Sequence, residues 1–275
     1  MTLAAGAHRV RAQQPDPLSE SEERLVNYGF ATQLGSGVYS VAGRTVQVYR
    51  LPFSYSARDE NERGWGLVVT FPVTLGFYDF RASDVIEEGI PDDLETASLV
   101  PGVEFRLPAG KRWLLKPYAR AGVVTESSDS ANAYVFGVGL RSIADFPAKG
   151  FGLAWGNGLD YSRVAPSGTG DDDLLSFETS LEARHALGLA VRRHELDYGL
   201  YGALSLYFDD PQFPLREDSD GSVDDQYEIG FTFGAKEPAR IWKIPVPRVG
   251  FGYRFGDEIS AVRFVIGTPV ASLTR

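Results

Sequence analysis

The chain has 275 residues, with no cysteine, 30 glycines, 12% aromatic residues and a formal net charge of -10. Without cysteine there is no disulfide scaffold, thiolate metal site or cysteine nucleophile, and no run of about 18 uncharged apolar residues is present to form a transmembrane helix. The acidic balance argues against nucleic acid as a partner, because attraction to phosphate needs positive charge. Abundant glycine and aromatic residues instead favour an all-β chain with many turns.

Residues 1–26 are predicted to form an N-terminal segment, followed by a single domain over residues 27–275. Residues 1–14 combine small residues with two arginines and resemble the remnant of a truncated export signal peptide, with a disordered terminus as the alternative. Residues 17–28 predict a short helix, because Ser19 or Ser21 can cap its start and Glu22 and Glu23 follow near its positive end.

From about residue 27 onward, apolar residues alternate with small or polar ones, which is the pattern of β-strands with two different faces. The clearest example has one face made of Trp65, Leu67, Val69, Phe71, Val73, Leu75 and Phe77. Turn signals divide the chain into about twelve strands, an even number as bacterial outer-membrane barrels require. We place them near residues 27–36, 44–58, 64–80, 97–107, 113–125, 132–143, 151–164, 173–186, 196–208, 223–234, 247–256 and 259–270.

The composition of the second face distinguishes a membrane barrel from a soluble sandwich. A soluble sandwich would show solvent a face rich in lysine, glutamate and threonine, whereas the second face here is largely glycine and small polar residues with scattered charges. In a membrane barrel the apolar side chains face lipid and the interior is polar. We therefore predict a transmembrane antiparallel β-barrel, with the soluble sandwich as the alternative.

The connections between the predicted strands differ in charge on the two sides of the barrel. If both termini are periplasmic, the outer loops are residues 81–96, 126–131, 165–172 and 209–222, which are rich in acidic residues, whereas the inner turns are more basic. Acidic loops can gather Ca²⁺ or Mg²⁺, but no spacing here matches a twelve-residue calcium loop. We expect solvated loops, with no metal site and no cofactor.

The inward face of the predicted barrel carries a set of charged residues that form our candidate site. Cations lie mainly on the fifth, sixth and closing strands and carboxylates on the seventh to tenth, so ion pairs across the lumen should fill a barrel of this size. The alternative is a transverse field that orients a permeating solute. The set is Arg50, Lys116, Arg120, Arg141, Asp160, Glu178, Glu182, Arg184, Asp197, Glu228, Arg254 and Arg263.

Catalysis has only a weak signal in the sequence. His185 and His194 are the only histidines in the predicted barrel, and the fragment His194-Glu195-Leu196-Asp197 is the best candidate for an acid–base pair. The chain has no His-X-Ser-Asn-Gly stretch of the kind found in outer-membrane phospholipases. We therefore expect no catalytic residues and predict that the chain is not an enzyme.

Two stretches carry a resemblance to a known family. Residues 34–80 include LGSGVYSVAGRTVQVYRLPFSYSAR and WGLVVTFPVTLGFYDF, and the chain closes with VGFGYRFG and AVRFVIGTPV. Together they resemble the solitary outer-membrane autotransporter-type β-domain proteins, which are autotransporter-like barrels without a passenger. The resemblance implies a twelve-stranded barrel akin to an autotransporter translocator.

Three hypotheses about function follow. The first is an integral barrel of the Gram-negative outer membrane with a structural or assembly role, whose partners are outer-membrane lipid, lipopolysaccharide and, during biogenesis, the barrel-assembly machinery. The second is a narrow, porin-like diffusion channel for small polar solutes. The third is an outer-membrane hydrolase, which we regard as the weakest.

Overall fold

The structure of the protein is a computed structural model that describes residues 35–41, 44–60, 64–78, 96–126, 132–148, 150–166, 172–191, 194–208, 225–236, 239–241, 244–246, 248–256 and 259–267. The predicted N-terminal segment, with its export-signal remnant and short helix, lies outside these residues, as do most of the predicted outer loops. Within the described part of the chain, no helix is long and apolar enough to cross a membrane.

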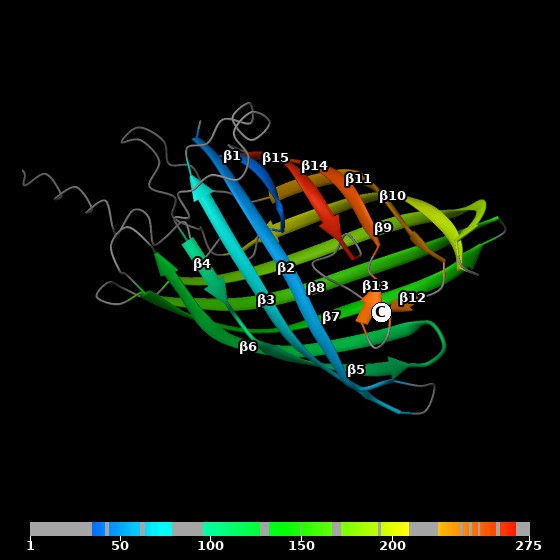
Figure 1. The fold of residues 1–275 in the computed structure, drawn as a ribbon, viewed down its shortest axis with the longest axis horizontal. Helices are drawn as coiled ribbons and strands as arrows, with labels where there is room; N and C mark the ends of the chain where they lie inside the picture. Colours follow the sequence, from blue (N-terminus) through cyan, green and yellow to red (C-terminus); the bar gives the residue numbers. More distant parts are fainter. Residues whose placement is uncertain are drawn as a thin grey trace, which may run out of the picture.

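The described strands form one closed antiparallel barrel (Figure 1). Each strand pairs with its neighbours in the sheet, and β1 pairs with β15, so that the blue first strand lies beside the red last strand. The barrel strands are β1 (Gly37–Val41), β2 (Arg44–Arg58), β3 (Gly66–Tyr78), β4 (Thr96–Leu99), β5 (Gly102–Ala109), β6 (Trp113–Glu126), β7 (Asn132–Ala148), β8 (Phe151–Pro166), β9 (Asp172–Val191), β10 (His194–Tyr207), β11 (Asp225–Ala235), β14 (Val249–Gly256) and β15 (Ile259–Ile266).

The barrel has twelve strand positions because β4 and β5 share one of them. Both strands pair with β3 on one side and β6 on the other. The all-β class, the antiparallel barrel and the number of strands predicted from the sequence are therefore confirmed.

The interruption between β4 and β5 corrects the single strand predicted at residues 97–107. Pro101 has no N–H to donate to the ladder, so regular pairing stops there. Two backbone hydrogen bonds hold the break in place, from Val100 N to Pro72 O at 3.3 Å and from Ala121 N to Pro101 O at 3.0 Å. Together, β4 and β5 still fill the place in the barrel wall, between β3 and β6, that one continuous strand was expected to fill.

Two further elements differ from the prediction. The strand β1, which begins at Gly37, was not among the predicted strands, and residues 27–34 of the strand expected over residues 27–36 lie outside the described residues. A separate two-stranded hairpin of β12 (Ala239–Ile241) and β13 (Ile244–Val246) lies in the connection between β11 and β14, where no strand was expected.

The hairpin of β9 and β10 extends beyond its neighbour β8. The pairing of β8 with β9 ends at Gly152 and Arg184, whereas β9 continues to pair with β10 as far as Val191 and His194. This extension lies at the end of the barrel where β5–β6, β7–β8 and β9–β10 connect through residues 110–112, 149–150 and 192–193, which we call the short-turn end. Figure 1 shows it as the yellow hairpin that projects from the barrel.

The two faces of the barrel wall have inverted polarity. Large apolar side chains such as Leu200 and Ile229 are each 60% exposed on the outer face, whereas Lys116 is 0% and Glu182 only 1% exposed on the inner face. A protein that folds in water buries its apolar side chains and leaves its charges outside. The opposite arrangement here is that of a barrel surrounded by lipid.

Candidate functional site

The candidate site is the polar interior of the barrel, which we call the lumen. Every second residue of a strand faces it, and the charged side chains that do so form four connected clusters. All twelve residues of the predicted set are buried or half-buried. Several contacts join strands that are not neighbours in the sheet, so the charges bridge across the lumen as well as along the wall.

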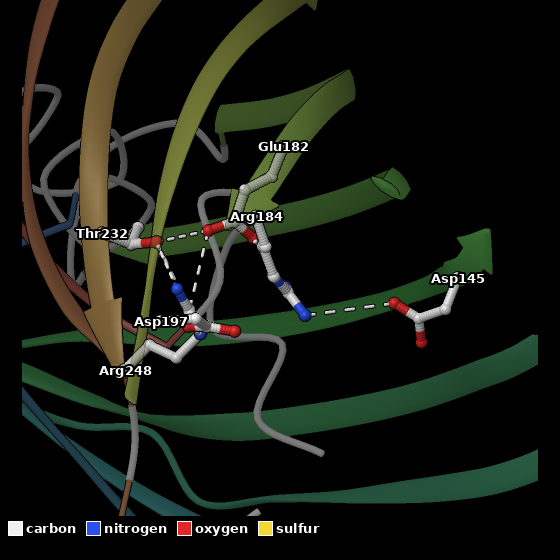
Figure 2. Close-up of polar contacts among 6 residues, drawn as sticks. All are labelled: Asp145, Glu182, Arg184, Asp197, Thr232 and Arg248. Carbon is white, nitrogen blue, oxygen red and sulfur yellow. Dashed lines mark hydrogen bonds and ion pairs between the residues drawn. The ribbon is translucent and has the colours of Figure 1, made fainter. Parts of the chain in front are cut away.

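The first cluster surrounds Glu182 near the short-turn end, and Figure 2 shows its contacts. Arg184 donates to Oε2 of Glu182 through Nη2 at 2.6 Å, and its Nη1 lies 4.0 Å from Asp145 on β7. Arg248 lies 3.6 Å from Oε1 of the same carboxylate and pairs with Asp197. Thr232 also donates its hydroxyl to Glu182. The partners of Glu182 thus come from β9, β11 and the segment before β14.

The second cluster surrounds Glu228 on β11. Its Oε2 accepts hydrogen bonds from Nε of Arg254, at 2.8 Å, and from Arg263, while Oε1 accepts the hydroxyl of Tyr201 at 2.6 Å. Arg254 also lies 3.5 Å from Glu178 on β9, which is separated from β14 by two strands of the sheet. This cluster links the closing strands to β9, three strand positions from β14.

The third cluster joins β6, β7 and β8. Nη2 of Arg120 donates to Oδ1 of Asp160 at 2.9 Å, and the hydroxyl of Tyr118 donates to the same carboxylate. The guanidinium of Arg141 lies 4.0 Å from the centre of the Tyr118 ring, a cation–π contact. Tyr118 therefore bridges a carboxylate and a cation.

The fourth cluster surrounds Glu104 on β5. Arg106 lies 3.3 Å from this carboxylate, and both Lys116 and Arg141 lie 3.8 Å from it. Arg106 also contacts Glu60 at 3.3 Å. One carboxylate thus faces three cations, and Arg106 also contacts a second carboxylate, Glu60.

The described side chains leave two cavities in the lumen. One has a volume of about 60 Å³ and the other about 50 Å³. The walls of both include Arg50, Tyr118, Arg120 and Arg141, so the cavities are adjacent. Arg50 thus lines both cavities.

Sequence reasoning missed several residues that complete these contacts. They share the inward position of the predicted charges: Glu104 and Arg106 alternate with Val103, Phe105 and Leu107, and Arg248 has the same strand parity as Arg254. This alternation could have identified them as inward-facing from the sequence. The partner of each charged residue could not be found in this way, because it depends on how the barrel closes. The missed residues are Glu60, Glu104, Arg106, Tyr118, Asp145, Tyr201, Thr232 and Arg248.

The histidine fragment considered for catalysis does not assemble into an acid–base pair. His194 is exposed, whereas Asp197 is buried in the lumen and bound to Arg248. Glu195 pairs with Lys236 at 2.7 Å on the surface. His185 places Nδ1 2.7 Å from the carbonyl oxygen of Gly150. Among the described residues, no three His, Asp or Glu side chains are grouped so as to hold a metal ion.

The comparison with solved structures found an autotransporter β domain with this fold. The β domain of the Bordetella autotransporter BrkA superposes with a TM-score of 0.50 and 11% sequence identity, over 83% of this chain and 92% of that one. LpxR from Salmonella typhimurium gives a TM-score of 0.42 and 11% identity, over 91% of this chain and 96% of that one. No family model matches the sequence, and no curated protein matches it.

The fold is therefore that of an outer-membrane β-barrel of the autotransporter β-domain kind, which confirms the resemblance seen in the sequence. One prediction needs correction: the statement that the chain is not an enzyme is wrong as a conclusion from this architecture. LpxR, which the comparison also found, is an outer-membrane enzyme, and the statement is therefore withdrawn. The likeness itself assigns neither a reaction nor a catalytic residue to this chain.

Proposed function

We propose that the chain is an integral barrel of the Gram-negative outer membrane with a structural or assembly role and a lumen filled by ion pairs. The inverted polarity of the wall carries this proposal. Residues such as Leu200 and Ile229 would cost free energy in water and are stabilised by lipid, whereas buried charges such as Glu182 need the partners that the lumen provides.

The density of lumenal contacts supports a filled barrel. Glu182, Glu228 and Glu104 each face at least two cations, and the bridges between non-adjacent strands lie across the space that a solute would use. Breaking such a buried pair leaves an uncompensated charge, which costs about 3 to 5 kcal/mol. The network therefore resists opening.

The partners follow from the same geometry. Outer-membrane lipid and lipopolysaccharide would cover the apolar belt, and the barrel-assembly machinery would insert the strands during biogenesis. We infer both kinds of partner from the barrel fold and its apolar outer face.

A narrow diffusion channel is the second candidate, and the two adjacent cavities favour it. They share four wall residues and lie inside the lumen, so a modest rearrangement of arginine side chains would join them. In that case the asymmetric charges would select permeating ions by sign.

Planar bilayers containing the purified full chain distinguish these functions. The filled barrel predicts weak conductance or none, because ion pairs occupy the lumen. Robust single-channel conductance would overturn the filled barrel and support the channel, and the reversal potential in a salt gradient would then report the selected sign of charge.

An outer-membrane location is checked separately, by fractionation of cells that express the chain behind a functional export signal. Recovery as a soluble monodisperse protein without detergent would contradict it.

A further inference from the structure

The charges around the larger cavity are unequal. Its wall includes five arginines, namely Arg50, Arg120, Arg141, Arg254 and Arg263, but only two carboxylates, Asp160 and Glu178. Two more carboxylates reach these arginines from beyond the wall: Glu228 contacts Arg254 and Arg263, and Glu104 contacts Arg141. Five arginines thus share four carboxylates among the described residues.

The carboxylate of Glu104 is itself divided among several cations. It faces Arg106 at 3.3 Å and Lys116 at 3.8 Å in addition to Arg141 at 3.8 Å. The cluster around Glu182 has the opposite balance, with three carboxylates for the two arginines Arg184 and Arg248. The described lumen is therefore positive around the cavity, whereas the cluster around Glu182 holds more carboxylates than cations.

We propose that the larger cavity binds a small soluble oxyanion, such as phosphate, sulfate or a short carboxylate, through Arg50, Arg120 and Arg141. This goes beyond the proposed function and does not depend on whether the barrel conducts. An excess of buried cations raises the free energy of the folded state, and an anion between them lowers it.

The chemistry of the wall selects the class of ligand. Guanidinium groups present planar pairs of N–H donors that match the oxygens of carboxylate and phosphate. The hydroxyl groups of Ser176 and Ser205, which also line the cavity, can donate to further oxygens. A cation would meet an excess of like charge, and an apolar ligand would leave these donors unsatisfied.

The size of the cavity limits the ligand. A volume of about 60 Å³ is several times the roughly 10 to 15 Å³ needed for one water molecule. It accommodates a few waters or one small oxyanion, and it excludes a large anion such as a nucleotide. Because the arginines face the lumen, the ligand is a free anion in solution and not a lipid headgroup on the outer face.

Equilibrium dialysis with inorganic phosphate tests this proposal on the full chain folded in a nonionic detergent at constant ionic strength. We expect saturable binding by the wild-type protein, and competition by sulfate. Arg50→Gln and Arg141→Gln should each weaken binding about 10- to 100-fold, the range for loss of a charged hydrogen bond. Arg163→Gln is the matched control, because Arg163 is exposed and pairs with Asp173 at 3.4 Å away from the cavity.

Each outcome decides the proposal. Absence of saturable phosphate binding by the wild-type protein would overturn it, whether or not the variants fold. Equal affinity in the wild type, Arg141→Gln and Arg163→Gln would also overturn it, because binding would then lie elsewhere on the surface. If Arg50→Gln does not fold, Arg141→Gln gives the same comparison. Since dialysis is performed in detergent, its result is separate from membrane location and from conductance.

Discussion

The hydroxyl of Tyr201 on β10 donates to Oε1 of Glu228 on β11 at 2.6 Å, while Oε2 of the same carboxylate is bound by Arg254 and Arg263. Both carboxylate oxygens of the buried Glu228 thus accept hydrogen bonds, one from a neutral hydroxyl and the other from two arginines. Gly252 on β14 leaves the space for this arrangement, because a Cβ atom there would overlap the Tyr201 hydroxyl and lie 2.5 Å from Oε1 of Glu228.

Tyr201→Phe should destabilise the barrel by about 1 to 3 kcal/mol, since it leaves one oxygen of a buried carboxylate without its donor. Urea unfolding of the protein folded into lipid vesicles measures this change. Tyr227→Phe is the control, because the Tyr227 hydroxyl bonds to Asp225 at 2.7 Å on the exposed face. Equal losses in the two variants would mean that Tyr201 does not stabilise Glu228.

Gly252→Ala should cost about 1 to 3 kcal/mol, because the added methyl group displaces the Tyr201 hydroxyl or the Glu228 carboxylate. The control is Gly202→Ala, whose Cβ would meet only the carbonyl oxygen of Glu228, at 3.9 Å. The same unfolding measurement applies. If Gly202→Ala lowers the free energy of unfolding by as much, the cost would come from replacing glycine in a strand and not from a clash in the lumen.

Glu182→Gln should lower the free energy of unfolding by about 3 to 5 kcal/mol, because Arg184 and Arg248 lose a shared buried partner. Glu195→Gln removes a comparably short ion pair, to Lys236 at 2.7 Å, but both of those side chains are more than half exposed. We expect no measurable loss there, because water screens the pair. Similar behaviour of the two variants would indicate that water fills the lumen around Glu182.

The strands could be predicted because their signal is local. Alternation along 44–58 and 113–125 gave the bounds of β2 and β6 almost residue for residue. It failed at Pro101, where a missing N–H interrupts the ladder in a segment whose side chains still alternate. The small hairpin of β12 and β13 is too short to show a period.

The partners of the lumenal charges could not be predicted in the same way. Arg254 on β14 forms an ion pair with Glu178 on β9. Which strands bring their side chains together in this way depends on the stagger and closure of the whole barrel. Strand parity alone would have added Glu104 and Arg248 to the inward set, because both alternate with outward apolar residues. It would not have shown that Glu104 faces Arg106, Lys116 and Arg141 together.

Leu200→Arg should destabilise the protein in lipid by about 2 to 4 kcal/mol, the cost of arginine near the bilayer midplane. Leu200 lies halfway along β10 and is 60% exposed. Leu189→Arg is the matched control, since Leu189 is 61% exposed but lies in the part of β9 that extends beyond β8. We expect a cost of about 0 to 1 kcal/mol there. Equal costs would show that depth in lipid does not distinguish the two sites.

The central claim, that the apolar outer face lies in lipid, is tested most directly by lipid quenching of a fluorophore on single-cysteine variants. The chain has no native cysteine, so Leu200→Cys and Leu189→Cys each carry one label. Leu200 pairs with Ala183, and residue 189 lies six positions further along β9, about 20 Å at roughly 3.3 Å per residue. In lipid vesicles, quenchers at the centre of the acyl chains should quench the label at position 200 strongly and the label at position 189 weakly. A label at position 200 that is open to aqueous quenchers and unaffected by lipid quenchers would contradict the account.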